Sequence, residues 1–255
     1  MLVTVDIGNT NITIGIFDKE DLIGTYRLTT KVRRTSDEYG FMLKNFLDRS
    51  NVHEKQIEAV IVSSVVPKVM HSFTNGIKKF VGIEPLIVGP GIKSGISVQL
   101  ENPRNVGADR IADCAGAFSE YGGPILVADF GTATTYDYVD ENGCFKAGAI
   151  GVGIETGANA LWGQTAQLPE IEIKRPKTIL ARNTQTEMQA GVFYQFLGGV
   201  EYTIAQFKKE VGKDMKVIAT GGLGRIVCNY TKSIDVYDPN LIFKGLKVIY
   251  EKNKD

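Results

Sequence analysis

A short pattern of an aspartate, an apolar residue and a glycine occurs twice in this chain, half a chain length apart. The first copy reads Val5-Asp6-Ile7-Gly8-Asn9-Thr10, and the second reads Ala128-Asp129-Phe130-Gly131-Thr132-Ala133. In both copies a run of apolar and β-branched residues precedes the aspartate and another follows the turn, which is typical of a β-hairpin. Solenoid repeats have periods of about 20–50 residues, so a repeat this long predicts two similarly folded halves instead.

The first half carries the patterns of several further elements. Strands are predicted near residues 2–6, 12–17, 22–29, 57–65 and 86–88. The segment Thr35-Ser36-Asp37-Glu38 has the form of a capping box and predicts a helix start, as does Pro67. Asn105 is the predicted N-cap of a helix that runs to about Tyr121.

The second half repeats this order. Strands are predicted near 125–129, 134–139, 145–150 and 216–219, with a long helix after Asn183-Thr184 and a final amphipathic helix from about Asn240. Hairpins that lead into helices, present in duplicate, resemble the actin-like, ribonuclease-H-like ATPases. We therefore expect an α/β fold of two duplicated domains, residues 1–116 and 117–255, with mixed β-sheets flanked by helices.

Composition and charge exclude several classes of protein. Lys+Arg and Asp+Glu both number 29, so no net field attracts nucleic acid or an anionic membrane. A membrane helix needs about 20 consecutive apolar residues, and no apolar run in this sequence is that long. No export signal is recognised. The three cysteines form no Cys-x-x-Cys pair, which fits a reducing compartment. The sequence therefore predicts a soluble, cytoplasmic protein that binds neither nucleic acid nor membrane.

The two glycine-containing turns have the residue types of a phosphate-binding site. A glycine has no Cβ, so a backbone N–H can approach a phosphate oxygen closely. Asn9, Thr10 and Asn11 add hydrogen-bond donors in the first copy, as Thr132 does in the second. An aspartate at a strand end supplies the hard oxygen that Mg²⁺ or another cation prefers. Either turn alone is also compatible with a plain tight hairpin, but the recurrence favours a nucleotide clamp.

Two further segments carry polar groups near predicted helix starts. Asp109 falls in the first turn of the helix capped by Asn105, where the helix dipole should keep it ionised and able to accept a proton. Arg110 beside it offers a planar fork for a carboxylate or phosphate. The alternative is an acid that only compensates the dipole. The segment Thr220–Gly224 could bind a phosphate at a helix start or be a plain strand-to-helix turn.

At this point the motifs resemble those of the type III pantothenate kinases over nearly the whole chain. The matching segments, in order, are Asp6–Asn11, Ser63–Pro67, Glu101–Pro103, Gly107–Arg110, Asp129–Ala133, Asn183-Thr184, Gln189–Gly191 and Ala219–Leu223. The resemblance implies ATP-dependent phosphorylation of the primary hydroxyl of pantothenate to 4'-phosphopantothenate, the first step of coenzyme A biosynthesis.

The resemblance also implies a role for each matching residue. The residues expected to bind ATP are Asp6, Ile7, Gly8, Asn9, Thr10, Asn11, Ile12, Thr13 and Thr132. Asp129 would bind a monovalent cation, K⁺ or NH₄⁺, while Mg²⁺ would enter with ATP beside Asp6. The residues expected to bind pantothenate are Gly107, Ala108, Asp109, Arg110 and Thr184, with Asp109 as the catalytic general base. The resemblance further implies a homodimer with the pantothenate pocket near the subunit interface.

The chain departs from the family pattern at one position. Where the family usually has tyrosine before Glu-Asn-Pro, this chain has Leu100, so one hydroxyl contact to the substrate is missing. Two other functions are compatible with this sequence. The chain could be a nucleotide or pantothenate binder that acts through a protein partner, or a phosphoanhydride hydrolase. Retention of Asp6, Asp109, Asp129 and Thr132 argues against a pure binder, since binding alone needs no base.

Overall fold

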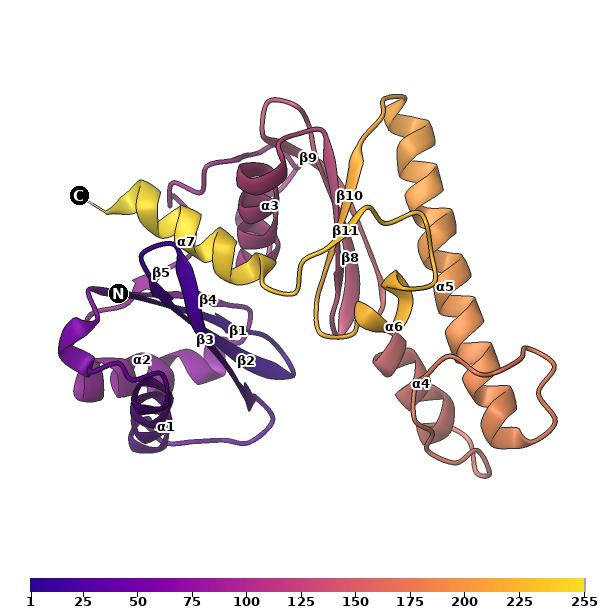
Figure 1. Cartoon of the computed structure of the whole chain (residues 1–255), viewed down its shortest axis with the longest axis horizontal. Coiled ribbons are helices and arrows are strands. Elements are labelled where there is room, and N and C mark those ends of the chain that lie inside the picture. Colours follow the sequence, from indigo (N-terminus) through magenta and orange to yellow (C-terminus); the bar gives the residue numbers. More distant parts are fainter. Residues whose placement is uncertain (255) are drawn as a thin grey trace. The chain divides into compact units, whose positions relative to one another are not determined.

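The computed structural model describes residues 1–254, which divide into two units, each built on a mixed β-sheet (Figure 1). The first unit contains Met1–Glu120 together with the C-terminal residues from Asn240, and the second contains Tyr121–Pro239. The boundary between the two units at Glu120 lies close to the expected boundary after residue 116. The return of the C-terminal helix to the first unit differs from the expected division into 1–116 and 117–255.

The sheet of the first unit has the strand order β3-β2-β1-β4-β5. The strands are β1 (Leu2–Ile7), β2 (Asn11–Asp18), β3 (Asp21–Thr29), β4 (Ala59–Ser64) and β5 (Leu86–Ile87). β1, β2 and β3 form an antiparallel meander, whereas β4 runs parallel to β1 and β5 runs parallel to β4. The central strand β1 is buried along almost its whole length, which fits its mainly apolar sequence.

The second unit repeats this topology. Its strands follow the order β9-β8-β7-β10-β11, with an antiparallel meander and then two parallel pairs. The strands are β7 (Ile125–Phe130), β8 (Ala133–Val139), β9 (Cys144–Val152), β10 (Lys216–Thr220) and β11 (Val236–Tyr237). The match between the two orders confirms the duplication that the repeated turn predicted.

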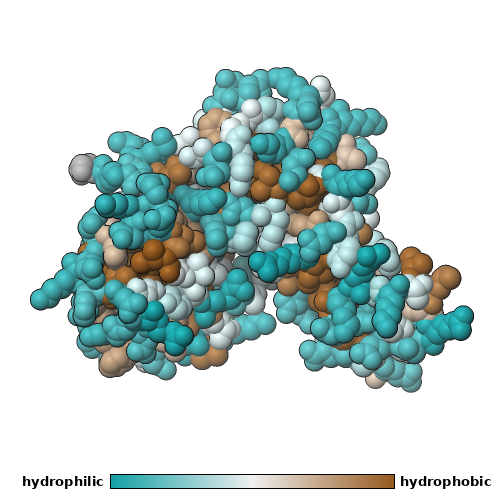
Figure 2. Space-filling model, in the orientation of Figure 1, coloured by the Kyte–Doolittle hydropathy of each residue, from teal (hydrophilic) through white to brown (hydrophobic). Residues whose placement is uncertain are grey.

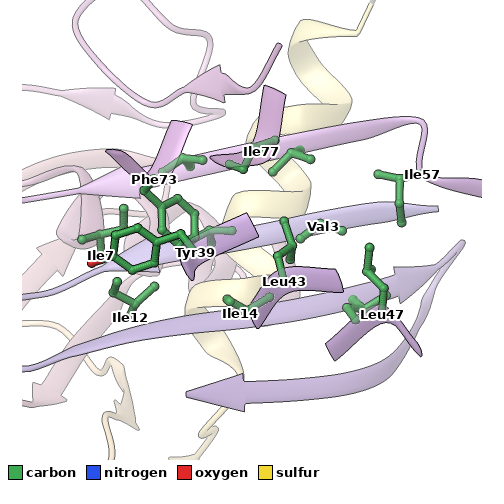
Figure 3. Packing of buried hydrophobic residues seen from close by; sticks show 14 of the residues in the cluster. Val3, Ile7, Ile12, Ile14, Tyr39, Leu43, Leu47, Ile57, Phe73 and Ile77 are labelled. Carbon is green, nitrogen blue, oxygen red and sulfur yellow. The ribbon is translucent and has the colours of Figure 1, made fainter. Parts of the chain in front are cut away.

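Two helices cover one face of the first sheet, as Figure 1 shows. They are α1 (Ser36–Arg49) and α2 (Pro67–Val81). The predicted capping box is confirmed, since the Thr35 hydroxyl accepts from the Glu38 N–H and the Glu38 carboxylate accepts from the Thr35 N–H. Figure 3 shows the core beneath these helices, where Ile12 and Ile14 from the sheet lie with Tyr39, Leu43 and Phe73 from the helices.

The opposite face of the first sheet is covered by the C-terminal helix. Helix α7 (Leu241–Asn253) packs its Phe243, Leu246 and Ile249 against Leu2 and Ile61 of the sheet and against α3 (Ala108–Tyr121). This apolar contact explains why the last residues belong to the first unit. A domain boundary placed from the sequence repeat could not predict this contact, because α7 and the first sheet come from opposite ends of the sequence.

The helices of the second unit are α4 (Ile154–Gly163), α5 (Thr184–Val211) and α6 (Arg225–Cys228). Asn183 caps α5 by accepting from the Thr186 N–H at 3.0 Å, so the predicted start of this helix is confirmed. Apolar residues of α5 such as Val200 and Ile204 pack on the sheet residues Leu126 and Ala128. Helix α6 has only four residues, so the expected helix after the glycine-rich segment is a single short turn.

The predicted N-cap at Asn105 is wrong. Asn105 ends a separate 3₁₀ turn, Pro103–Asn105, and the extended backbone of Val106 interrupts the chain before α3 begins at Ala108. Pro103 favours this separate turn because its ring fixes the backbone at a first helical position. The remaining short elements are the 3₁₀ turn Glu54–Gln56 and strand β6 (Ser97–Val98).

The visible face of the molecule is largely hydrophilic, with hydrophobic residues in separate patches (Figure 2). Among residues 1–254, no helix combines the length and the apolar character needed to cross a bilayer.

The crossing of α3 and α7 yields a test of this packing. A Cβ at Gly245 would overlap the carbonyl of Ala112, so Gly245→Ala should lower the free energy of unfolding by about 1–3 kcal/mol through overpacking. A matched control is Gly198→Ala in α5, where nothing lies within 4 Å and alanine should be neutral or stabilising by up to about 1 kcal/mol. Urea denaturation measures both, and equal effects would contradict the packing described.

Candidate functional site

The first repeated turn joins β1 to β2 and is closed by a backbone hydrogen bond. The Gly8 N–H donates to the Asn11 carbonyl at 2.9 Å, which leaves Asn9 and Thr10 at the tip. Within the hairpin Asp6 lies opposite Thr13. The hydroxyl of Thr13 is buried and has no hydrogen-bond partner among residues 1–254. The side chains of Ile7 and Ile12 are fully buried in the core, so these two residues can offer a ligand only their backbone.

A residue outside the hairpin fixes the shape of this turn. The Thr30 N–H donates to the Thr10 carbonyl at 2.9 Å, and the Thr30 hydroxyl donates to the Gly8 carbonyl at 2.8 Å. Both carbonyls therefore point toward the end of β3. Thr30 could not be identified from the sequence, because no motif connects it with a turn twenty-two residues away.

Asp6 is held from the neighbouring parallel strand. The Ser63 hydroxyl donates to Oδ1 of Asp6 at 2.9 Å, and the register of β1 with β4 places these residues side by side. The next link in the ladder is the bond from the Val65 N–H to the Ile7 carbonyl at 3.1 Å. The carboxyl ends of β1 and β4 thus form one edge of the sheet, and Asp6 lies at this edge.

Asp109 lies at the start of α3, next to the same edge. A Cβ at Gly107 would overlap Oδ1 of Asp109 and would lie 3.5 Å from Cγ1 of Val65, the residue that follows β4. The carboxyl group therefore folds back over Gly107, which only a residue without a side chain permits. The Arg110 N–H donates to Oδ1 of Asp109 at 2.8 Å. Asp6 and Asp109 are in this way brought to one edge of the first unit.

Burial shifts the pKa of Asp109. Desolvation raises the pKa of its carboxyl group above the ordinary value, and the Arg110 N–H and the Arg110 charge oppose this shift without cancelling it. The prediction from sequence considered only the helix dipole, which stabilises the ionised form. A carboxylate with a raised pKa is a stronger base, so burial favours proton acceptance rather than simple dipole compensation.

The second repeated turn joins β7 to β8 and is tighter. The Gly131 N–H donates to the Ala133 carbonyl at 3.1 Å, which leaves the exposed Thr132 alone at the tip. The Thr132 carbonyl accepts from the Gly153 N–H at 3.2 Å and from the Thr156 hydroxyl at 2.6 Å, both at the start of α4. The two copies therefore share the strand–turn–strand plan but differ in turn length.

The glycine-rich segment after β10 lies against Asp129. Gly221 has φ +88°, and a Cβ there would overlap Oδ1 of Asp129 and would lie 2.6 Å from the Phe130 carbonyl oxygen. Tyr237 fixes this segment by donating its hydroxyl hydrogen to the Gly221 carbonyl at 3.0 Å. The Asp129 carboxylate and the Phe130 carbonyl oxygen therefore lie together beside Gly221, and oxygens of these two kinds are the ligands that a hard cation takes. Gly221 and Tyr237 were not recognised as supports of Asp129 from sequence.

The remaining predicted residues have simpler surroundings. Thr184 is the first residue of α5 in the second unit, and Leu100 is half-buried in the first. Beside the start of α3 there is a cavity of about 590 Å³, lined by Ala108 and Arg104 and mostly by apolar side chains of the segment 88–98 and of α3. Leu100, Asp109 and Arg110 do not line it. The first unit therefore brings together residues 6–13 and 107–110, while Asp129, Thr132 and Thr184 belong to the second.

The chain is similar to known proteins in sequence and in fold. Residues 2–206 match the model of the family described as type III pantothenate kinase. A type III pantothenate kinase from Bifidobacterium longum (strain DJO10A) is 59% identical over 254 residues, which cover 99% of each chain. Among solved structures, a Campylobacter jejuni protein described as a Baf family transcriptional activator has a TM-score of 0.59 and 21% identity, covering 98% of each chain. A ROK hexokinase from Thermus thermophilus has a TM-score of 0.52 and 11% identity, covering 99% of each. The structural likenesses bear on the fold alone and confirm the expected actin-like ATPase class.

The raised pKa of Asp109 predicts how one substitution changes stability with pH. Above its folded-state pKa, Asp109 carries a desolvated charge that destabilises the folded chain, and protonation removes this cost as the pH falls. Asp109→Asn should therefore raise the urea midpoint at pH 8, and the gain should disappear below about pH 4, the ordinary range of aspartate. The exposed Asp48→Asn is the control. No gain at pH 8 for Asp109→Asn would refute the effect of burial.

Proposed function

The chain belongs to the type III pantothenate kinase family, and from this membership and the geometry of the first unit we propose that it transfers the γ-phosphoryl group of ATP to the primary hydroxyl of pantothenate. Enzymes of this family are phosphotransferases of coenzyme A biosynthesis. The observation that carries the proposal is the Asp109 carboxyl group, which lies beside the sheet edge that ends in the Asp6 turn and has a raised pKa.

Asp109 is the proposed general base. Its carboxylate accepts the proton of the pantothenate hydroxyl as the hydroxyl oxygen attacks the γ-phosphorus, and the bond to the β-phosphate oxygen breaks to release ADP. Gly107, Ala108, Arg110 and Thr184 are the proposed pantothenate contacts, with Arg110 suited to the substrate carboxylate. In such transfers positioning and electrostatics supply most of the acceleration.

Residues 6–13 and Thr132 are the proposed ATP contacts. The first turn is supported at two carbonyls by Thr30, so its backbone is held in one shape before a nucleotide binds. Mg²⁺ that enters with ATP would lie near the Asp6 carboxylate and would neutralise charge on the phosphates. Because ATP is the donor, we assign the reaction to the cytoplasm; recovery of the activity in a membrane or extracellular fraction would contradict this.

We also propose a homodimer. Apolar side chains of the second unit remain exposed on β9 and in the segment before α5, namely Ile150, Val152, Ile179 and Leu180. Ile150 and Val152 point to the same face of β9, and two neighbouring exposed apolar side chains support a protein interface there. Sedimentation should then give twice the chain mass of 27.9 kDa, and a species of single mass at micromolar concentration would count against the dimer.

The role of Asp109 predicts a separation of kinetic constants. Asp109→Asn should lower kcat by about 10²–10⁴-fold, because the base is lost, with little change in the KM for ATP. In the wild type, kcat/KM should fall as the pH drops through the raised pKa of Asp109, since protonation removes the base. ADP release with and without pantothenate measures this. Release that needs no pantothenate indicates a hydrolase, no release indicates a binder, and an unchanged kcat in Asp109→Asn refutes the base.

A monovalent cation at Asp129 is proposed and predicts a dependence on K⁺ or NH₄⁺. Such a cation would supply positive charge near the phosphates, and Asp129 with the neighbouring carbonyl oxygens would hold it. Replacement of K⁺ by Li⁺ should lower activity and the thermal midpoint of the wild type. In Asp129→Asn the midpoint should no longer respond to K⁺. If the activity and the thermal midpoint of the wild type are the same with K⁺ and with Li⁺, this part of the proposal is wrong.

A further inference from the structure

Ser63 is a fully buried polar residue near the end of β4, whose first four residues are apolar. It follows Ala59, Val60, Ile61 and Val62 in β4, and its hydroxyl donates to Oδ1 of Asp6 at 2.9 Å. A carboxylate only accepts hydrogen bonds, so the direction of this bond is fixed while Asp6 is ionised. Since the Ser63 backbone belongs to the β1–β4 ladder, the sheet itself determines where its hydroxyl lies.

The bond fixes the orientation of the whole Asp6 carboxylate. With Oδ1 held by Ser63, Oδ2 is directed toward the turn, 3.8 Å from the position that a Gly8 Cβ would occupy. An aspartate side chain has several rotamers and a broad terminal torsion, and the bond from Ser63 favours the arrangement in which Oδ2 faces the turn. A site held in one arrangement before its ligand binds loses less entropy on binding.

We propose that Ser63 is a positioning residue, which orients Asp6 so that Oδ2 is presented to the Mg²⁺ of the Mg–nucleotide complex at the first turn. The inference rests on the proposed function, because it takes Asp6 to face Mg²⁺–ATP. It adds that the binding of the cation depends on a serine of the neighbouring strand, fifty-seven residues away in sequence. Nucleotide that carries no Mg²⁺ does not use this oxygen and should not depend on Ser63.

Two substitutions at Ser63 test the role, and the next residue supplies a matched control. Ser63→Ala removes the donor, and Ser63→Cys keeps nearly the same volume with a weaker donor. The control is Ser64→Ala, since the Ser64 hydroxyl accepts from the Val66 N–H at 3.0 Å and is directed to the chain after β4. Thermal unfolding verifies that each variant is folded. If Ser63→Ala does not fold, Ser63→Cys still provides the test.

The readout is calorimetric binding of ADP to the full chain, with Mg²⁺ and with EDTA. Ser63→Ala should weaken binding with Mg²⁺ by about 10-fold or more, the factor for one hydrogen bond to a charged group, and Ser63→Cys by less. Binding in EDTA should be unchanged in both, and Ser64→Ala should match the wild type under both conditions. An equal loss with and without Mg²⁺, or no loss at all, overturns the positioning role.

The proposed function has a separate readout. A wild type without pantothenate-dependent ADP release contradicts the kinase activity, whereas the binding comparison still decides whether Ser63 acts through Mg²⁺. A wild type that releases ADP with pantothenate, combined with no Mg²⁺-specific loss in the Ser63 variants, contradicts the inference alone.

Discussion

The parallel pairing of β1 with β4 is the constraint on which the candidate site depends. Its register places Asp6 beside Ser63 and continues through the bond from Val65 to Ile7, so both strands end at one edge. Gly107 lies against Val65 at that edge, so the first turn of α3, which follows Gly107 directly, lies there too. A shift of the register by one residue would turn Asp6 to the opposite face of the sheet, toward the core under α1 and α2. Asp6 would then no longer lie at the edge beside Ser63 and the start of α3.

The start of α3 combines two opposing effects on one carboxyl group. The helix dipole and the Arg110 N–H stabilise the ionised form of Asp109, while burial against Gly107 destabilises it and prevails. Folded chains rarely keep a desolvated carboxylate for stability alone, because neutral residues of the same shape cost less free energy. The arrangement is therefore best explained by its chemistry, and the proposed base gains proton affinity at the expense of the stability of the fold.

Local patterns in the sequence predicted the elements well and their long-range contacts poorly. The repeated turn, the capping box at Thr35 and the start of the long helix near Asn183-Thr184 depend on neighbouring residues, and all three are confirmed. The packing of α7 on the first sheet was not predicted, because it joins opposite ends of the chain. The raised pKa of Asp109 and the supports at Ser63 and Thr30 also depend on residues distant in sequence or on the burial that folding creates.

With Asp109 as the proposed base, the phosphoryl acceptor loses its proton at the edge shared by β1, β4 and α3. A crystal structure of the chain with Mg²⁺, a non-hydrolysable ATP analogue and pantothenate tests it most directly. In that complex the primary hydroxyl oxygen of pantothenate should lie within about 3.2 Å of an Asp109 carboxylate oxygen, with phosphate oxygens on the backbone N–H groups of the Gly8–Asn11 turn. Pantothenate bound with its hydroxyl away from Asp109, or phosphates bound away from this turn, would contradict it.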